Sequence, residues 1–392
     1  PMIHSSIKMP RGYGVRNTVS LLHMRQYLDN LLAIHIGGVK IPVLTLIIIA
    51  LLCLFIIWFR KTKLGKDMRA VGQDMDVAGE AGIKTSAFIG ILFAFAATCL
   101  VMWKGMGMLP RDQGREFAVD GKKSAGKPRG AGFLFVLVFI AAALLFGQVS
   151  REMIIYLILT GAAMITGFLD DCAKTPWGEY KKGFLDLLIA VMVAVTFLNF
   201  NSNEVTILLT GASFTIPPIL FGLLVVVLVW VSINVTNCSD GVDGLSGTLT
   251  IITLMIIYLV DLLQSRGDSF SYLILMFCVC ILGYLWYNAT PSRLMMGDAG
   301  SRAMGLFISI AVLKTGSPFL YIPVALVLIL DGGLGLVKIF LLRFLKIRIL
   351  TKVRTPLHDQ ARKVWEWSNT QTVFRFAIIQ IMLGAAVIFI AM

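Results

Sequence analysis

The sequence predicts an all-α, polytopic integral membrane protein with ten transmembrane helices and an extra apolar segment near the N-terminus. Of the 392 residues, 57% are hydrophobic and only 15% are charged, whereas a soluble domain is about 45–50% apolar and about 25% charged. The same composition excludes a disordered chain, which would be polar and poor in aromatic residues. The formal net charge of +13 must therefore be explained within a membrane protein.

Apolar runs that are long enough, or nearly long enough, to span a bilayer recur along the whole chain, since a span needs about 20 residues. They lie near 41–59, 86–103, 133–148, 152–169, 184–200, 217–235, 245–263, 271–290, 302–316, 319–345 and 373–392. From residue 86 onward, basic residues gather in alternate loops. The positive-inside rule places these loops in the cytoplasm, which fits ten spans with both termini outside.

The first 83 residues do not follow this alternation. A basic loop at 60–69 is separated from the basic loop at 104–129 by a single apolar run, so one crossing cannot leave both in the cytoplasm. We therefore predict two parts, an N-terminal extension over 1–83 and a ten-helix domain over 84–392. Residues 64–83 resemble a cytoplasmic loop of ribose-type sugar ABC-transporter permeases, which makes the extension a fragment of such a protein.

Carboxylates gather where the predicted spans reach the cytoplasm. Asp170 and Asp171 end one apolar run, and Lys174 follows at helical i,i+4 and i,i+3 spacing. Adjacent carboxylates repel one another unless a cation or a proton lies between them, and Mg²⁺ prefers such hard oxygen ligands. The alternative is an ordinary solvated helix end stopped by Pro176.

Two further clusters combine acids with glycines. Residues 234–247 place Asp240 and Asp243 among glycines directly after an apolar run, and residues 287–301 place Asn288 ten positions before Asp298. Glycines let a backbone approach a ligand closely. The alternatives are a turn rich in Asn, Asp and Gly and, for Asp298, a helix N-cap.

Two basic segments complete the set. His358 lies in the basic loop near 346–363, where a lone histidine is more often structural than catalytic. Residues 121–132 are glycine-rich and basic but do not match a Walker A loop; they either hold a diphosphate or only set the topology. Taken together, the clusters predict a Mg²⁺ site for phosphoryl chemistry on the cytoplasmic face.

From about residue 84 onward, nearly four fifths of the chain is similar to the phospho-N-acetylmuramoyl-pentapeptide transferases (the MraY family). The motifs that carry the resemblance are Asp170-Asp171-x-x-Lys174, Asn237-x-x-Asp240-Gly241-x-Asp243-Gly244-Leu245, Asn288 with Met296-Gly297-Asp298-x-Gly300-Ser301, Pro356-Leu357-His358, and Trp367-Ser368 with Arg375-Phe376.

The resemblance implies a reaction and a location. Phospho-MurNAc-pentapeptide passes from UDP-MurNAc-pentapeptide to undecaprenyl phosphate, giving lipid I and UMP with Mg²⁺ as cofactor. The enzyme would be a multi-pass homodimer in the bilayer of the bacterial inner membrane. The basic excess is then a topology signal and a phosphate-handling surface, so no nucleic-acid partner is expected.

The resemblance also implies roles for individual residues. Asp298 and Asp171 would hold Mg²⁺, and Asn288 would support the metal and the diphosphate. Asp170 would deprotonate the lipid phosphate for direct attack; a covalent carboxylate intermediate is the other family proposal. Lys174 and Lys182 would neutralise phosphate charge.

The remaining implied roles concern the donor. The residues implied to bind its uridine and diphosphate are Asn237, Asp240, Gly241, Val242, Asp243 and Lys123. His358 would lie beside the nucleotide and the sugar.

The sequence departs from the family at three places. His358-Asp359-Gln360 stands where the family has three consecutive histidines, and Gly126–Gly132 differs from the usual G-T-P-T-M-G-G. The third departure is the placement of lysines: Lys123 is displaced by one residue from the family position, and the segment between Asp171 and the next lysine pair is short, so Lys182 rather than Lys181 is assigned to the site.

Two alternatives remain. A related transferase that moves a HexNAc-1-phosphate from UDP-HexNAc to a polyprenyl phosphate would share the aspartate motifs. A sugar ABC-transporter permease is the alternative from another class, motivated by residues 64–83.

Overall fold

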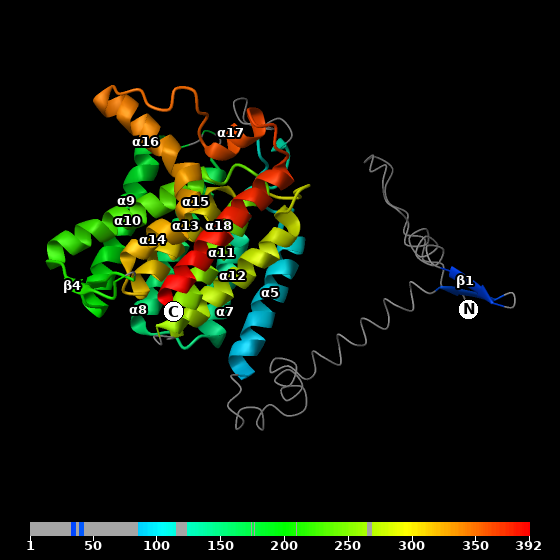
Figure 1. Ribbon diagram of the computed structural model, residues 1–392, viewed down its shortest axis with the longest axis horizontal. Helices are drawn as coiled ribbons and strands as arrows, with labels where there is room; N and C mark the ends of the chain where they lie inside the picture. Colours follow the sequence, from blue (N-terminus) through cyan, green and yellow to red (C-terminus); the bar gives the residue numbers. More distant parts are fainter. Residues whose placement is uncertain are drawn as a thin grey trace. The chain divides into compact units, whose positions relative to one another are not determined.

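The computed structural model describes residues 33–36, 39–42, 85–114, 124–173, 175, 177–208, 210–264 and 269–392 (Figure 1). The chain divides into two compact units, 1–85 and 86–392. In the first unit, β1 (Ala33–Ile36) pairs antiparallel with β2 (Val39–Pro42). Apart from its first two residues, which belong to β2, the apolar run predicted near 41–59 lies outside the described residues, as does 64–83.

The second unit is helical. Its long helices are α5 (Thr85–Gly105), α7 (Gly132–Phe146), α8 (Arg151–Asp171), α9 (Glu179–Phe200), α10 (Pro218–Cys238), α11 (Leu245–Leu263), α12 (Ser269–Asn288), α13 (Gly297–Lys314) and α18 (Asn369–Ala391). Shorter elements are η1 (Pro318–Leu320), α14 (Tyr321–Val324), α15 (Leu326–Leu328), η2 (Ile329–Gly333), α16 (Leu334–Phe340), η3 (Leu341–Leu345) and α17 (Leu357–Lys363). A small antiparallel hairpin, β3 (Glu204–Thr206) with β4 (Ser213–Thr215), joins α9 to α10.

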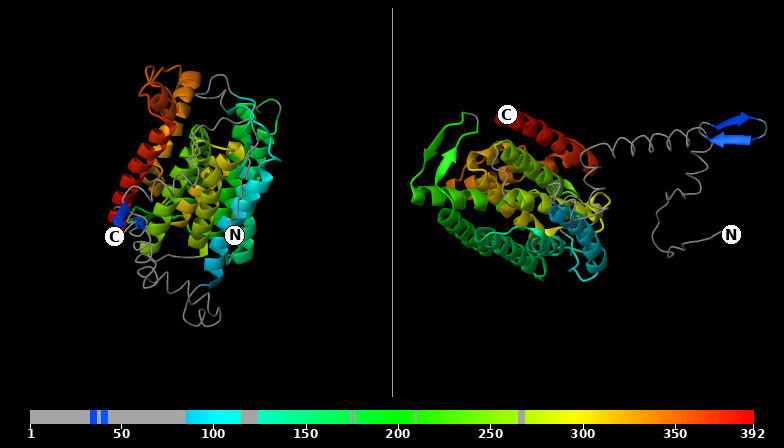
Figure 2. Two further views of the ribbon diagram at one scale, coloured as in Figure 1. Left: turned by 90° about the vertical axis from the view of Figure 1, so that its right-hand side faces the viewer. Right: turned by 90° about the horizontal axis from the view of Figure 1, so that it is seen from below.

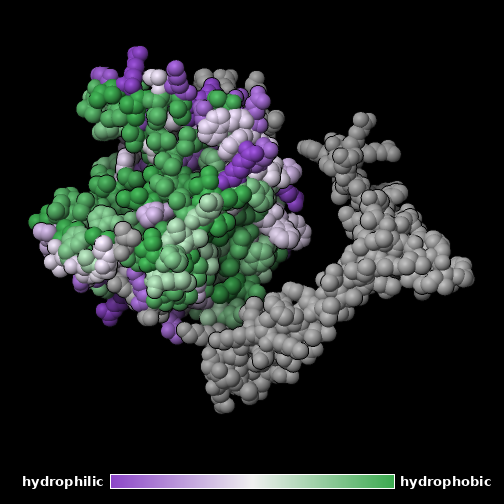
Figure 3. Space-filling view, viewed as in Figure 1, coloured by the Kyte–Doolittle hydropathy of each residue, from purple (hydrophilic) through white to green (hydrophobic). Residues whose placement is uncertain are grey.

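This architecture confirms an all-α polytopic membrane protein. Within the described residues, seven helices are long and apolar enough to cross a membrane, and a bent pair, Pro318–Val324 with Leu326–Leu345, makes up to eight. The helices run side by side as one bundle (Figure 2). Hydrophobic side chains cover the middle of its surface, and hydrophilic ones gather toward two opposite ends (Figure 3).

Local sequence explains where several helices begin. The Ser150 side chain accepts a hydrogen bond from the Met153 N–H at the start of α8, and Ser368 with Gln371 forms a capping box at the start of α18. Helix α10 begins with Pro218, whose missing N–H is no loss in a first turn.

Helix α13 lies at the centre of the bundle, and glycines let its neighbours reach its backbone. A Cβ added to Gly167 of α8 would lie 2.4 Å from the Asp298 carbonyl oxygen, and one added to Gly132 of α7 would lie 1.9 Å from the Gly300 nitrogen. Neither position has space for a side chain. Helices α7 and α8 are therefore held against the first turn of α13, where Asp298 lies.

The buried Arg302 corrects one step of the topology argument. By the positive-inside rule Arg302, at the start of the apolar run predicted at 302–316, is a basic residue of a cytoplasmic loop, but it lies inside α13 and is 2% exposed. It pairs with Asp186 of α9, with 3.0 Å between Arg302 Nε and Asp186 Oδ1. A buried arginine with a carboxylate partner is a packing feature, so it carries no information about orientation.

Candidate active site

Asp170 and Asp171 are buried at the last turn of α8, and their side chains have different partners. Asp170 Oδ2 lies 2.5 Å from Lys182 Nζ, and its Oδ1 accepts a hydrogen bond from the Trp177 N–H at 2.7 Å. Asp171 accepts the N–H groups of Asp298 and Ala299, each at 3.1 Å. An anion at a helix N-terminus is favourable, so Asp171 fixes the start of α13 beside the end of α8.

A glycine makes this contact possible. Gly297 has a φ of +71°, a conformation that side chains disfavour. A Cβ on this residue would also lie 2.2 Å from Asp171 Oδ2. Helix α13 has Met296 as its N-cap residue, so the alternative that Asp298 is an ordinary N-cap is wrong, and its carboxylate is available for other contacts.

Lys182 joins Asp170 to Asp298. Its ammonium nitrogen lies 2.5 Å from Asp170 Oδ2 and 2.9 Å from Asp298 Oδ2. The structure thus brings Lys182 to the carboxylates, whereas Lys181 lies over the Trp177 ring, 3.4 Å from its centroid. Lys174 lies outside the described residues.

Arg129, in the loop before α7, is the second cation of the site. Its Nε lies 2.9 Å from Asp171 Oδ1, and its terminal nitrogens lie 3.5 Å from Asp298 and 3.6 Å from Asp112. Burial acts to lower the pKa of this guanidinium, but the surrounding carboxylates outweigh it and raise the pKa. Sequence reasoning placed Arg129 in the basic segment 121–132, as a holder of diphosphate or a topology signal, without assigning it a role of its own, and it did not name Asp112.

These six side chains form what we call the carboxylate cluster: Asp112, Asp170, Asp171, Asp298, Arg129 and Lys182. Its four carboxyl groups outnumber its two cationic side chains, an excess that suits the binding of a further cation. Among the described residues, no group of three or more His, Cys, Asp and Glu side chains is already arranged as a metal site. The oxygens of Asp170 and Asp298 nevertheless converge on one cation, the Lys182 ammonium, and such oxygens suit Mg²⁺.

The last turn of α10 and the turn that follows it, together called the loop 237–244, lie beside this cluster and contain the predicted donor-binding residues from Asn237 to Asp243. Asn237 donates a hydrogen bond to Ser301 Oγ on α13 at 2.9 Å, and Asp243 Oδ2 lies 3.7 Å from Lys127 Nζ. The Val242 side chain is buried. The structure therefore joins this loop both to α13 and to the basic segment before α7; Lys123 of that segment lies outside the described residues.

Asn288 holds this loop in place. Its Oδ1 accepts the Gly244 N–H at 2.8 Å, and its Nδ2 donates to the Leu294 carbonyl at 2.9 Å. Both ends of the amide are therefore bound to backbone groups. The structure gives Asn288 a bracing contact, while support of a metal and a diphosphate stays a prediction.

His358 lies in α17 and reaches the same loop. Its ring contacts Asp331 of η2, with Nδ1 2.9 Å from Asp331 Oδ2, and both residues are buried. A Cβ added to Gly241 would lie 2.2 Å from His358 Nε2. Sequence reasoning missed Asp331, although an acid inside the apolar run 319–345 was a signal for a functional residue.

Asp240 is the acid of this loop whose proton affinity is most altered. Burial raises its pKa to about 7, and the nearby carboxylates of Asp298 and Asp171 act in the same direction. The ordinary value for an aspartate is about 3.9. Near neutral pH and without a bound cation, the folded protein therefore holds a proton here that the unfolded chain has released.

We expect Asp240→Asn to stabilise the Mg²⁺-free protein relative to wild type, increasingly as the pH rises from about 5 to about 8. Because the folded-state pKa is raised, ionisation favours the unfolded wild-type chain over this window, whereas asparagine does not titrate. Thermal unfolding of both proteins across the pH range measures the difference in Tm. A difference that is constant or shrinks with rising pH would contradict the expectation.

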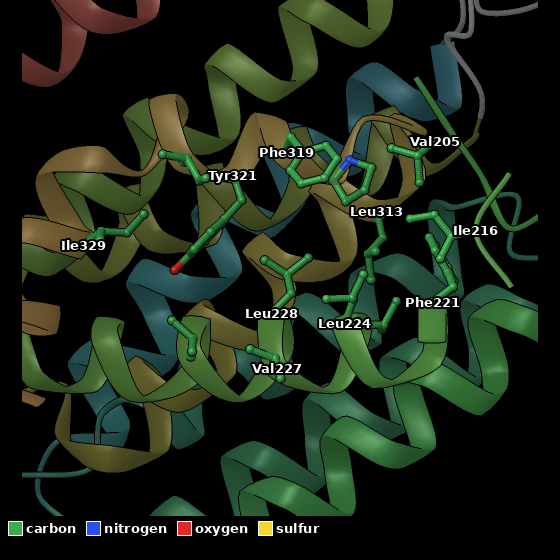
Figure 4. A pocket seen from close by; sticks show the side chains of 14 residues that line it. Val205, Ile216, Phe221, Leu224, Val227, Leu228, Leu313, Phe319, Tyr321 and Ile329 are labelled. Carbon is green, nitrogen blue, oxygen red and sulfur yellow. The ribbon is translucent and has the colours of Figure 1, made fainter. Parts of the chain in front are cut away.

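An apolar cavity of about 390 Å³ lies apart from the charged residues. Leu224, Val227 and Leu228 of α10 line it opposite Phe319 and Tyr321, and Val205 and Ile216 close the end beside the β3–β4 hairpin (Figure 4). Its lining suits hydrocarbon rather than a polar ligand.

Comparison with known proteins shows two similarities in different parts of the chain. Residues 153–316 match the family model described as glycosyl transferase family 4. Residues 13–100 match the permease component of branched-chain amino acid transport systems, so this similarity extends beyond the predicted boundary at 83 and into α5.

Individual relatives cover most of the second unit. The chain is 42% identical over 314 residues to a protein of Treponema pallidum (strain Nichols) named phospho-N-acetylmuramoyl-pentapeptide-transferase, covering 74% of this chain and 85% of the relative. Relatives with the same name from Symbiobacterium thermophilum and Wolbachia pipientis wMel are 28% and 24% identical, covering 70% and 74% of this chain and 83% and 92% of their own lengths.

Proposed function

The chain belongs to the phospho-N-acetylmuramoyl-pentapeptide transferase family, and on this premise we propose that it makes lipid I for peptidoglycan synthesis. In this reaction an oxygen of undecaprenyl phosphate bonds to the β-phosphorus of UDP-MurNAc-pentapeptide. The bond between that phosphorus and the bridging oxygen breaks, and UMP leaves with the electron pair.

The observation that carries the proposal is the carboxylate cluster. Asp170 and Asp171 from α8 and Asp298 from α13 meet at one place, together with Lys182 and Arg129. Phosphoryl transfer depends on positioning and on stabilising charge at the phosphates. Cations held among carboxylates, beside a loop rich in glycine and aspartate, suit a diphosphate bound through Mg²⁺.

The donor set fits Mg²⁺ as the cofactor, with Asp298 as its first candidate ligand. Asp171 is the second predicted ligand, although its oxygens already accept two backbone N–H groups and an arginine N–H. When bound, Mg²⁺ would offset negative charge on the phosphate oxygens. Lys182, which contacts Asp170 and Asp298, would then pair with phosphate as well.

Asp170 is the candidate base. Its carboxylate oxygen lies within reach of Lys182, and the Trp177 N–H fixes its other oxygen. In the proposed reaction Asp170 accepts the proton of the lipid phosphate, which then attacks directly. The loop 237–244 and His358 would hold the nucleotide and the sugar, with Asp243 and Lys127 near the diphosphate.

We also propose ten spans with the site on the cytoplasmic side of the bacterial inner membrane. The seven long apolar helices, the bent pair, the 15-residue α7 and the 18-residue α13 make ten helical segments of the described chain. The basic loops 104–129 and 346–363 lie at the cytoplasmic end by the charge rule. The homodimer implied by the family belongs to the same proposal.

The apolar cavity supports a lipid substrate. It lies along α10, the helix that leads into the loop 237–244. A polyprenyl chain is hydrocarbon, so part of it could occupy such a cavity while its phosphate reaches the carboxylate cluster.

A UMP-release assay tests the proposed function. Purified protein with undecaprenyl phosphate and UDP-MurNAc-pentapeptide should release UMP only when Mg²⁺ is present, and a chelator should stop release until Mg²⁺ is restored. UDP-HexNAc donors in the same assay test the related HexNAc-1-phosphate transferase. Preference for a UDP-HexNAc would replace the first proposal by the second, and absence of UMP from every donor would refute both.

Residues 1–83 are proposed to be dispensable for transfer. The carboxylate cluster and the loop 237–244 lie wholly within the second unit. A protein that begins at Lys84 should keep transfer activity within a few-fold of the full chain, as measured by UMP release per mole of folded protein. Loss of folded, active protein would show instead that the N-terminal unit is integral to the enzyme.

A further inference from the structure

Asp331 is a buried acid that is hydrogen-bonded to a histidine, His358. Its side chain is completely buried in η2, in the middle of the bent segment. Asp331 Oδ1 accepts the backbone N–H of His358 at 2.8 Å, and both carboxylate oxygens face His358 Nδ1 at 3.0 and 2.9 Å. Such an acid is costly to bury unless it has a function or a well-matched partner.

The backbone around Asp331 is held against the donor-binding loop. A Cβ added to Gly332 would lie 2.2 Å from the Val235 carbonyl oxygen and 2.9 Å from Ser239 Oγ. Ser239 Oγ also contacts the Leu328 carbonyl at 3.3 Å. Residue 331 is therefore fixed relative to the end of α10, from which the loop 237–244 begins.

The other ring nitrogen of His358 faces that loop. The absence of a Cβ at Gly241 leaves room for Nε2, and the side chain of Asp359 lies 3.7 Å from Nε2. Arg362 donates to the Gly241 carbonyl at 3.2 Å and to Asp359 Oδ1 at 2.8 Å. Helix α17 thus contacts the loop 237–244 at the backbone of Gly241, and the Nε2 edge of the His358 ring lies beside that backbone.

Because Asp331 is the partner of the His358 ring, it determines which ring nitrogen carries the proton. A carboxylate only accepts hydrogen bonds, so Nδ1 must be the donor to Asp331. In a neutral imidazole the other nitrogen then has a free lone pair. The buried carboxylate also disfavours a turned-over ring, in which the Cδ2–H group would face the two oxygens in place of the Nδ1–H donor. It likewise disfavours the other tautomer, whose bare Nδ1 would face the same two oxygens.

We propose that Asp331 is a positioning residue that holds His358 with its proton on Nδ1, so that Nε2 accepts a hydrogen bond from a hydroxyl group of the nucleotide-sugar donor. This role rests on the proposed function for the nature of the ligand. The proton position does not rest on it, since it follows from the contacts of Asp331 alone.

The chain allows a direct test of the proton position. It has four histidines, His4, His23, His35 and His358. Replacing the first three by glutamine in the full-length chain leaves His358 as the only histidine. Nitrogen NMR of this protein with ¹⁵N-labelled histidine, in lipid bilayers near pH 8, reports which ring nitrogen is protonated. We expect a protonated Nδ1 and a bare Nε2.

Asp331→Asn in this background should reverse the pattern. The asparagine oxygen must stay on the His358 backbone N–H, so its NH₂ group faces Nδ1 and moves the proton to Nε2. Transfer, measured as kcat/KM for the donor, should fall roughly 10- to 100-fold, as for other residues that orient a ligand group. The control Asp359→Asn should leave Nδ1 protonated.

The outcomes separate the two proposals. A bare Nδ1 in the unsubstituted Asp331 protein, or a proton that stays on Nδ1 in a folded Asp331→Asn protein, overturns the positioning role. If Asp331→Asn does not fold, the spectrum of the Asp331 protein still decides. The expected spectra in a protein without UMP release would keep the proton position and refute the proposed transfer.

Discussion

Replacing Asp298 by asparagine is expected to lower lipid I formation by about three orders of magnitude or more while the protein still folds. The carboxylate is the first candidate ligand of Mg²⁺, and it contacts both Lys182 and Arg129. A bound metal contributes several kcal/mol to stabilising charge at a phosphoryl group, and each 1.36 kcal/mol is about tenfold in rate. Asparagine keeps the size of the side chain but removes its charge.

Asp261→Asn is a matched control. Asp261 is also a buried aspartate, hydrogen-bonded to Ser271, but it lies near the far end of α11 from the loop 237–244. This variant should lose stability and keep transfer activity. UMP release, Tm and the Mg²⁺-induced shift in Tm should be measured for both variants. Turnover of Asp298→Asn within tenfold of wild type would refute the assignment of Asp298.

Asp170→Asn is expected to lower turnover by about 10² to 10⁴, the usual contribution of a general base. The loss should be largest near pH 6 and smaller toward pH 9. A phosphate monoester loses its second proton near pH 6, so at higher pH the lipid phosphate needs no base. Asparagine still offers an oxygen to the Trp177 N–H, so the turn after α8 should keep its shape.

The pH dependence of turnover distinguishes a role of Asp170 as a base from a role in positioning Lys182. UMP release by wild type and Asp170→Asn should be compared at saturating donor across this range. If the ratio of wild-type turnover to Asp170→Asn turnover falls as the pH rises, Asp170 acts as a base. An equal loss at every pH would show that Asp170 acts by holding Lys182, and near-normal turnover at pH 6 would remove it from the site.

The meeting of Asp170, Asp171 and Asp298 was predictable, because each follows or begins an apolar run at the same predicted membrane face. The cation that pairs with Asp170 could not be predicted in this way. Helical spacing pointed to Lys174, which lies outside the described residues, so that pairing stays a prediction. The partner that the structure does show, Lys182, comes from the next helix, α9. Such a pairing depends on how α8, α9 and α13 cross, which the periodicity of one helix does not contain.

The membrane spans were likewise predicted in position but not in detail. Apolar runs located the helices, but α13 begins at Gly297, before the run predicted at 302–316. Its first turn is polar because it holds Asp298. The run 319–345 was expected to be one span, yet it bends by 70° between Pro318–Val324 and Leu326–Leu345. Pro323 lies beside the break, and proline lacks the N–H that a continuous helix requires.

The backbone contacts around α13 determine which positions of the sequence can tolerate substitution during evolution. Side chains on the lipid-facing surfaces of α9 and α18 can be exchanged for other apolar ones, since lipid adapts to their shape. At Gly132 and Gly167 the neighbouring backbone occupies the place of a Cβ, so no compensating change in a neighbouring side chain can restore the fit. A saturation mutagenesis library selected for growth should therefore accept almost any apolar residue at Val191 or Phe389 and nothing but glycine at these two positions.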